Sequence, residues 1–403
     1  MAADLDVQNY YLTLEPNIER GFIKGTVVIS FTTSSDQSSV IFNSGQLQVH
    51  QVQGESVASF QTSNSKLTIE LSNSDSTEHI VKIDYSGAPT KGLLFNKSLG
   101  QAYTVYFTSH WMICHQNPED KATIRMDVLI SEDKQCIASG ELITKKKVGR
   151  KSLYQWKQDY ETPAYTYGFV VGNFKKHEMK YHSIAINNYS SSHSLTELAK
   201  IFRETPKIIS FFEEKSGIPY NQKSYNQILI GYHYQEKSGV SILKETYGNH
   251  VLKDSMETNL ISHELAHQWW GNRITCKNWN HFWLNEAVAT FMSAAYNEYR
   301  FGREKYQSDI NAYFKVYESV KNRKNDKPLV FDNWINPSKD DRNIVYFKGA
   351  YVLHLLRQEM GELAFWEGIK NYSKYYFDKH VTTVDFQNMM EESAQKELSK
   401  FFN

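Results

Sequence analysis

The spacing of apolar residues divides the chain into two halves with different hydrophobic periodicity. From about residue 6 to residue 174, short runs of alternating apolar and polar residues are separated by Ser, Asn, Asp and Gly. Alternation with frequent turn residues predicts an antiparallel β-sandwich or a saddle-shaped sheet. We expect strands in the runs at 10–14, 25–31, 66–71, 79–85, 123–130 and 168–171.

Helical spacing dominates the second half. Ser194 and Glu197 form a capping-box pattern ahead of apolar residues spaced as on a helix face. A strand-like run at 227–231 is followed by a helix that we expect at 255–270. Further helices are predicted at 286–300, 303–319, 348–360, 363–377 and 385–395.

The two halves meet in a polar stretch that resembles a connector, because residues 175–177 and 187–194 are rich in Lys, Asn and Ser. We therefore predict an α+β chain with an N-terminal β-domain at 1–180 and a mainly helical domain at 181–403. The length of 403 residues agrees with more than one domain, since it exceeds the size at which a single core keeps growing.

Composition excludes several classes of function. Lys and Arg total 45 and Asp and Glu total 45, so no net field attracts nucleic acid or an anionic membrane surface. No apolar run reaches the length of a membrane span, so we expect a soluble protein. If Met1 is native the chain is expected in the cytoplasm, and if a signal peptide was removed it is expected in the periplasm or outside the cell. Cys114, Cys136 and Cys276 are too few and too scattered for a disulfide framework, and we expect buried thiols.

The strongest chemical pattern is HELAH at residues 263–267. Helical residues turn by about 100° each, so His263 and His267 lie on one face and both imidazoles can reach one metal ion. Glu264 flanks this face and is a candidate general base. The short pattern HExxH can also arise by chance on a surface helix, so the surrounding sequence has to support it.

That support comes from Glu286, nineteen positions after His267. It begins an apolar run that continues to Met292 and predicts a second buried helix able to deliver a third ligand. Three protein ligands are typical of a catalytic zinc, which keeps an open position for water and lowers the pKa of that water to about 7. We predict one Zn²⁺ held by His263, His267 and Glu286, with Glu264 as the base.

Residues 263–291 read HELAHQWWGNRITCKNWNHFWLNEAVATF, which resembles the aminopeptidase N and leukotriene hydrolase family of zinc peptidases. The resemblance includes the GN after the paired tryptophans and WLNEA, where the family usually has WLNEG. It extends to VYFKG at 345–349, similar to the family's Tyr-x-Lys-Gly, to the GIPY segment ending at Tyr220, and to FVVGNF at 169–174. The resemblance implies a thermolysin-like catalytic domain after the β-domain, and it implies that Tyr346 hydrogen-bonds the oxyanion.

The match weakens where the family binds the free amine of its substrate. In place of Gly-x-Met-Glu-Asn this chain has residues 233–237, HYQEK, in which only Glu236 is retained. An anionic carboxylate can pair with an ammonium group, so Glu236 is the candidate amine anchor, and the alternative is a solvated surface glutamate. The family's Gln-x-Glu segment also has no clear counterpart here, and Tyr103, Tyr106 and Tyr234 are candidates to line the pocket.

The leading hypothesis is a zinc aminopeptidase that removes N-terminal residues from oligopeptides. One alternative is a zinc endopeptidase, or a hydrolase of other polar substrates such as an epoxide, since the amine-recognition segment is altered. A third is a non-catalytic scaffold of the same fold. The chain ends where the family's catalytic domain ends, without the usual helical lid, and an open cleft would admit longer peptides.

Overall fold

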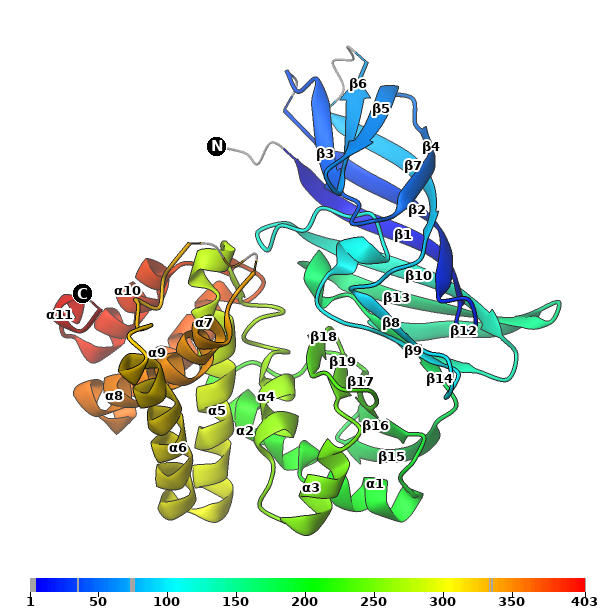
Figure 1. Cartoon of the computed structure of the whole chain (residues 1–403). Helices are drawn as coiled ribbons and strands as arrows, with labels where there is room; N and C mark the ends of the chain where they lie inside the picture. The colour runs from blue at the N-terminus through cyan, green and yellow to red at the C-terminus, as the bar shows by residue number, and fades with distance from the viewer. Residues whose placement is uncertain (1–4, 35, 73–76, 333, 335, 403) are drawn as a thin grey trace. The chain divides into compact units, whose positions relative to one another are not determined.

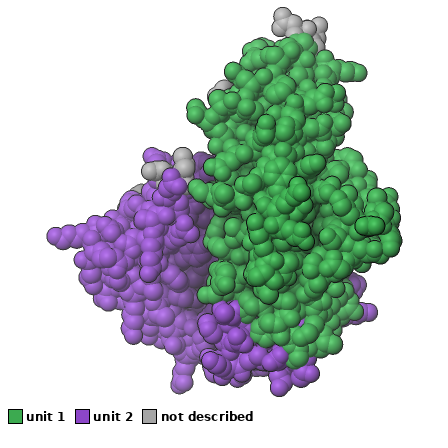
Figure 2. Space-filling model, turned by 45° about the vertical axis from the view of Figure 1, so that its right-hand side comes forward, with its two compact units in different colours: residues 1–178, 184–195, 222–245 green, residues 179–183, 196–221, 246–403 purple. Residues whose placement is uncertain are grey.

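The computed structural model describes residues 5–34, 36–72, 77–332, 334 and 336–402. The chain forms two compact units, which Figure 2 shows in different colours. The first unit holds residues 1–178, 184–195 and 222–245, and the second holds residues 179–183, 196–221 and 246–403. The two units are not separated at a single position in the sequence, because residues 184–195 and 222–245 belong to the first unit.

The first unit is built on a seven-stranded sheet (Figure 1), and apolar side chains of this sheet contribute to its core. Tyr10, Leu12 and Leu14 alternate with more exposed neighbours along one strand and are fully buried. All strand pairs in this sheet are antiparallel except β1 with β10, which is parallel. The strands in spatial order are β12 (Glu141–Val148), β13 (Lys151–Pro163), β10 (Lys121–Ser131), β1 (Asp6–Asn17), β2 (Phe22–Thr32), β7 (Glu78–Gly87) and β4 (Gln48–Gln53).

Two smaller sheets complete the β-rich part. One has the order β3 (Ser39–Asn43), β6 (Lys66–Leu71), β5 (Val57–Ser63), and the other has the order β11 (Gln135–Ala138), β14 (Phe169–Gly172), β9 (Gln101–Thr104), β8 (Leu93–Asn96). Every predicted run of the first half lies in a strand except at Gly168, which directly precedes β14, and the run at 66–71 coincides with β6. The prediction of a β-rich N-terminal half followed by a helical half is therefore confirmed.

The predicted connector is wrong. Residues 175–177 and 187–190 belong to two strands of a five-stranded sheet, ordered β15 (Lys175–Tyr181), β16 (Ile184–Ser190), β17 (Ser224–Leu229), β19 (Val240–Leu243), β18 (Gln235–Lys237). Their polar side chains are satisfied within the sheet, since Asn187 Nδ2 donates to Asn226 Oδ1 at 3.0 Å and Gln227 Nε2 donates to Asn188 Oδ1 at 2.8 Å. Buried amides that pair across parallel strands look like loop residues in the sequence.

Helices make up most of the second unit, with α5 at their centre (Figure 1). Residues of α5 are buried around its whole circumference from Trp283 to Asn297, which is typical of a helix surrounded by others. The helices are α1 (Leu195–Ile201), which begins at the end of the first unit, α2 (Thr205–Ser216), α3 (Tyr247–Lys253), α4 (Asn259–Ala266), α5 (Trp283–Phe301), α6 (Arg303–Asn322), α7 (Lys339–Asn343), α8 (Gly349–Met360), α9 (Glu362–Tyr376), α10 (Thr383–Ala394) and α11 (Ser399–Phe402).

The five later helices agree with the prediction to within a few residues, but the metal helix is shorter than the expected 255–270. The segment before α4 turns because side chains take the backbone donors: Asp254 Oδ1 accepts from Met256 N at 2.9 Å, and Glu257 Oε1 accepts from Asn259 N at 3.0 Å. Such local side-chain bonds compete with helix formation.

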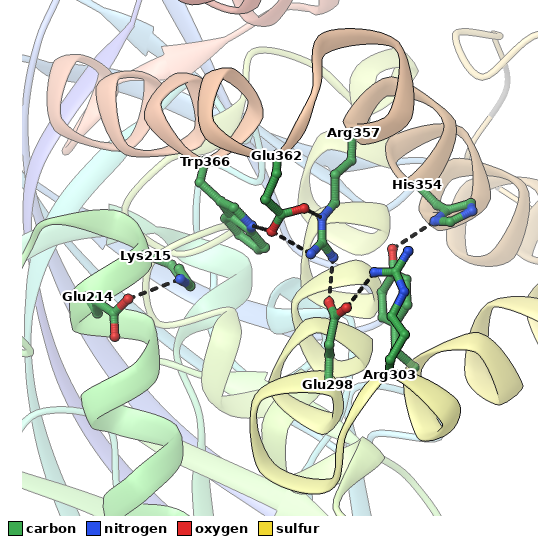
Figure 3. A network of polar contacts seen from close by, with 9 residues as sticks. Glu214, Lys215, Glu298, Arg303, His354, Arg357, Glu362 and Trp366 are labelled. Atoms are coloured by element: carbon green, nitrogen blue, oxygen red, sulfur yellow. Dashed lines mark hydrogen bonds and ion pairs between the residues drawn. The ribbon is translucent and has the colours of Figure 1, made fainter.

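An ionic network centred on the buried Arg357 ties four of these helices together (Figure 3). Arg357 of α8 is only 8% exposed and donates from Nη1 to Glu298 Oε2 of α5 at 2.6 Å. Its Nε and Nη2 donate to the two carboxylate oxygens of Glu362 of α9 at 2.7 and 2.6 Å. Arg303 of α6 forms an ion pair with the same Glu298. The Arg357 guanidinium thus links α8 to both α5 and α9.

One expectation from composition, that the cysteines are buried thiols, is met. Cys114, Cys136 and Cys276 are buried and form no disulfide. No described helix has both the length and the apolar character needed to span a membrane.

Candidate metal centre

Three potential ligand atoms converge in the second unit. His263 Nε2 and His267 Nε2 are 3.1 Å apart, and each lies 3.4 Å from Glu286 Oε2. Donors that surround a tetrahedral zinc at about 2.0–2.1 Å are separated by about 3.3–3.4 Å. The three atoms therefore fit one face of such a tetrahedron. They form the one group of three or more His, Cys, Asp or Glu found able to hold a metal within the described residues.

Two helices place these ligands. Short helix α4 carries His263 in its last turn and ends at Ala266, so that His267 is its C-cap with helical dihedrals. Helix α5 contributes Glu286 from its first turn. The two helices are tied together at Asn297, whose Oδ1 accepts from Thr258 Oγ1 and whose Nδ2 donates to Asn259 Oδ1, both at 2.6 Å. The structure therefore brings the two histidines of HELAH and Glu286 together, and their role as metal ligands stays a prediction.

The outer ring nitrogens of both histidines face oxygen atoms. His267 Nδ1 lies 3.0 Å from the carbonyl oxygen of Trp270. A carbonyl only accepts, so this Nδ1 carries the proton and Nε2 keeps its lone pair for the metal. His263 Nδ1 lies 3.4 Å from Thr290 Oγ1, and that hydroxyl donates to the carbonyl of Glu286 at 2.7 Å. The same tautomer follows for His263, because the hydroxyl is left as an acceptor.

These supporting groups were missed in the sequence. Thr290 lies one helical turn after Glu286 on α5, a spacing that could have drawn attention to it. The carbonyl of Trp270 has no sequence signal of its own. It reaches His267 because the chain turns back at Gly271, where φ is +132° and an added Cβ would lie 2.8 Å from His267 Nδ1. The glycine of the WWGN pattern is required here by both its backbone angle and the space available.

The charge balance of the site suits a dication. Burial opposes ionisation of Glu286, but its interactions with His267 and His263 outweigh burial and lower the pKa of this carboxyl. The result is a buried carboxylate next to two imidazoles. Together with the nitrogen and oxygen donor set, this is the chemistry of a catalytic zinc site with three protein ligands.

Two further predicted residues lie beside the ligands. Glu264 directly follows His263 on α4 and is buried. Tyr346 lies in η4 (Ile344–Lys348), a single π-helical turn between α7 and α8, and its ring stacks on that of His263 with centroids 5.8 Å apart and an interplanar angle of 21°. Such turns are frequent at functional sites because they shift the direction of one side chain relative to the flanking helices.

The predicted amine anchor lies in the first unit, on edge strand β18. Gln235 and Lys237 are buried there, while Glu236 between them points to the opposite face and is half-buried. The Lys237 ammonium donates to the carbonyl of Tyr165 at 2.8 Å. The alternation presents Glu236, and not its neighbours, on the more accessible face of the strand.

Two of the three candidate pocket tyrosines gather next to this strand. Tyr103 is 3% exposed, and its hydroxyl lies 3.3 Å from His233 Nδ1. Tyr106 is 44% exposed, and its backbone N–H donates to Gln235 Oε1 at 2.5 Å. Tyr234 directly precedes β18. Of the three tyrosines, Tyr106 is the most exposed.

Comparison with known proteins agrees with this site. Residues 201–403 match the peptidase family M1 domain, and residues 7–166 match the peptidase M1 N-terminal domain. The matched catalytic segment covers half of the chain and contains the HELAH sequence, Glu286 and Tyr346. The chain therefore belongs to peptidase family M1.

Similar curated proteins come from archaea and a yeast. "Probable aminopeptidase 2" of Sulfurisphaera tokodaii is 24% identical over 98% of this chain and 53% of its own length. The leucyl aminopeptidase of Saccharolobus solfataricus is 24% identical over 98% of this chain and 52% of its own length, and "Aminopeptidase 2" of Candida albicans is 24% identical over 97% and 46%. This chain thus spans about half the length of the curated relatives that it matches.

Solved structures match over nearly the whole chain. The M1 zinc metallopeptidase of Deinococcus radiodurans superimposes with a TM-score of 0.81 at 20% identity, covering 99% of this chain and 94% of that one. A mutant of that enzyme bound to Tyr-Ser-Ala gives a TM-score of 0.80 at 20% identity, covering 97% and 93%. The fold is accordingly that of a two-domain M1 peptidase, and one zinc ion is the expected cofactor.

Proposed function

We propose that this chain is a zinc-dependent metallopeptidase, and that it acts as an aminopeptidase which removes N-terminal residues from oligopeptides. The observation that carries the proposal is the convergence of His263, His267 and Glu286 within 3.4 Å of one another, next to the buried Glu264. The names of the relatives from Sulfurisphaera and Saccharolobus support the same reading. So does the tripeptide bound by the similar Deinococcus enzyme.

Each residue of the site has a separate part in peptide hydrolysis. When bound, zinc supplies a Lewis acid that polarises a carbonyl and makes water easier to deprotonate. Glu264 takes the proton of the attacking water and returns it to the leaving amine, so that the C–N bond can break. The Tyr346 phenol donates a hydrogen bond to the oxyanion that develops on the carbonyl oxygen. Thr290 and the Trp270 carbonyl hold the two imidazoles in the tautomer that binds metal.

Recognition of the substrate amine is assigned to Glu236. A carboxylate that pairs with an N-terminal ammonium forms a charge-assisted hydrogen bond, which is the interaction an exopeptidase needs. The alternation along β18 supports this assignment because it presents Glu236 on the more accessible face.

A second candidate is an endopeptidase or another hydrolase with altered amine recognition. It is favoured by Tyr103, since this buried side chain stands third, after Gln101-Ala102, where the resemblance implies the glutamate of the family's Gln-x-Glu as a second amine-binding carboxylate, and its phenol lies beside His233. With one carboxylate in place of two, discrimination between free and blocked N-termini would be weaker.

Fluorogenic peptides with free and with acetylated N-termini, each assayed with and without chelator, test the proposal. The aminopeptidase function predicts cleavage of the free peptide, loss of cleavage with chelator and recovery with Zn²⁺. Equal cleavage of the acetylated peptide would contradict the aminopeptidase function and favour an endopeptidase. A purified protein that binds no zinc and cleaves neither peptide would leave only a non-catalytic scaffold.

A further inference from the structure

Helices α5 and α8 meet at a contact that has room for only one methyl group. The Cβ that an alanine would have at position 349 would lie 2.4 Å from Cβ of Ala287, far inside van der Waals distance. Both residues are buried. Gly349 has φ −60° and ψ −47°, an ordinary helical conformation that any residue adopts. Glycine is therefore required at this position by space alone.

This contact lies next to both parts of the candidate active site. Ala287 follows the ligand Glu286 directly on α5, and Gly349 begins α8 immediately after η4, which carries Tyr346. The ring of Tyr346 stacks on the ligand His263, so the phenol and the ligands belong to helices that touch at Ala287 and Gly349. The separation of α5 and α8 at this point determines how far the phenol lies from the metal ligands.

The same two helices are tied a second time, away from the site. Arg357 of α8 forms the 2.6 Å contact with Glu298 of α5 that Figure 3 shows. Along the helix axes this tie lies about 12 Å from Gly349 and about 16 Å from Ala287. Because that end is held, an added methyl group at the near end has to be accommodated by a tilt of α8. A tilt of α8 moves η4 and Tyr346 with it.

We propose that the single methyl group between Ala287 and Gly349 is a spacer that positions Tyr346 relative to the metal centre. The proposal rests on the role of Tyr346 as oxyanion donor. Ala287 and Gly349 are positioning residues, since the role assigned to them is to fix the distance between two helices. To reach 3.4 Å, the lower end of ordinary contact, the helices have to separate by about 1 Å. A displacement of about 1 Å can lower turnover by about 10²-fold.

Moving the methyl group from one helix to the other tests the spacer. Gly349→Ala should lower kcat by about 10²-fold, with KM and zinc content unchanged. The double variant A287G/G349A should recover kcat to within about fivefold of wild type. In that variant the methyl group at position 349 faces Cα of residue 287 and Leu329 Cδ2, both at 3.7 Å, which is ordinary contact. A wild-type kcat in Gly349→Ala, or a swapped variant that is as slow as Gly349→Ala, would overturn the proposal.

Two controls separate positioning from stability. Gly368→Ala adds a methyl group to α9, where it meets the flexible end of Met390 at 2.8 Å, away from the ligands. It should lower Tm without lowering kcat. If Gly349→Ala does not fold, the swapped variant still decides, because the spacer requires it to fold and to turn over, and failure of either contradicts the proposal.

A double-mutant cycle separates this proposal from the role of Tyr346 itself. If the spacer acts through Tyr346, adding Gly349→Ala to Tyr346→Phe should lower kcat no further. A further drop of about 10²-fold in the combined variant would contradict the spacer while leaving the oxyanion role intact. A wild-type kcat in Tyr346→Phe alone would instead remove the oxyanion role.

Discussion

The candidate metal centre and the candidate amine site differ in how many groups define them. At the end of α4 and the start of α5, three candidate ligand atoms lie within 3.4 Å of one another, and the outer nitrogen of each imidazole faces an oxygen atom. Strand β18 offers only the carboxylate of Glu236. A tetrahedral metal tolerates little displacement of its ligands, so residue types and spacing are closely tied to its chemistry. An ammonium group can be bound by any oxygen atoms at hydrogen-bond distance. The comparison indicates that the residues for the chemical step lie in a short sequence motif, whereas selectivity for the substrate N-terminus depends on residues from several segments.

The largest loss of turnover is expected for Glu264→Gln. The amide keeps the shape of the side chain but cannot take a proton from water, so kcat should fall by about 10²- to 10⁴-fold. Zinc content should stay at one ion per chain, because the three ligands are untouched. Metal analysis and kcat on a free peptide amide check both points. Turnover equal to wild type would remove Glu264 from the mechanism.

Tyr346→Phe should be the next most damaging change. It keeps the ring that stacks on His263 and removes one oxyanion donor, and kcat should fall by about 10²- to 10³-fold with little change in KM. Tyr351→Phe is the matched control, since this ring of α8 packs on Phe314 with centroids 4.9 Å apart. Steady-state kinetics of both variants test the role, and equal kcat values in the two would refute it.

A smaller and more selective effect is expected in the recognition region. Glu236→Gln should lower kcat/KM for peptides with a free amine by about 10- to 100-fold, the equivalent of a hydrogen bond to a charged group. Cleavage of N-acetylated peptides should not change. Glu141→Gln, at a strand of the same unit where the side chain pairs with Lys223, is the control. If both peptides lose the same factor, Glu236 acts on the structure and not on the amine.

The smallest effect on catalysis is expected for a carboxylate outside both regions. Glu204 accepts from Arg300 Nε and from the Tyr296 hydroxyl, both at 2.8 Å. Burial opposes its ionisation, but Arg300 and Tyr296 outweigh burial and hold the pKa of Glu204 below its usual value. Glu204→Gln should lower the free energy of unfolding by about 2 kcal/mol at pH 7. It should leave kcat unchanged at a temperature where both proteins are folded.

The pH dependence of that loss has a defined sign. A carboxyl with a lowered pKa in the folded state stabilises the protein above its unfolded pKa of about 4.3, and this stabilisation disappears as the pH falls further. The gap between wild type and Glu204→Gln should therefore close below about pH 4. Denaturant unfolding from pH 7 to pH 3 measures the gap, with Glu318→Gln at an exposed position of α6 as control. A constant gap across this range would show that ionisation of Glu204 contributes nothing.

Much of the fold could be predicted because its signals are local. Alternation identified the strands around Tyr10 and Leu12, and helical spacing identified α5 and α6 nearly to their ends. The connector prediction was wrong for the opposite reason, since Asn188 is satisfied by Gln227, which lies on a strand distant in sequence. The boundary at 180 stays a prediction, although it lies between the two segments that match M1 domains.

The candidate site was predictable only in part. HELAH and Glu286 carry fixed residue types at fixed spacing, so the sequence alone predicted zinc, its ligands and its base. The supporting contacts were not predictable, because the Trp270 carbonyl is a backbone group and the partner of Thr290 depends on how two helices pack.

By itself the sequence determined the chemistry: two histidines one helical turn apart, a third ligand, a flanking glutamate and a family resemblance that marked Tyr346. Only the tertiary structure decided which ring nitrogens face the carboxylate of Glu286 and how close α8 comes to α5. Those properties arise from distances between segments remote in sequence, and a single methyl group at Ala287 facing Gly349 is enough to set one of them. Spacing along one helix follows from covalent geometry, whereas spacing between helices follows from the volume of the side chains that pack between them.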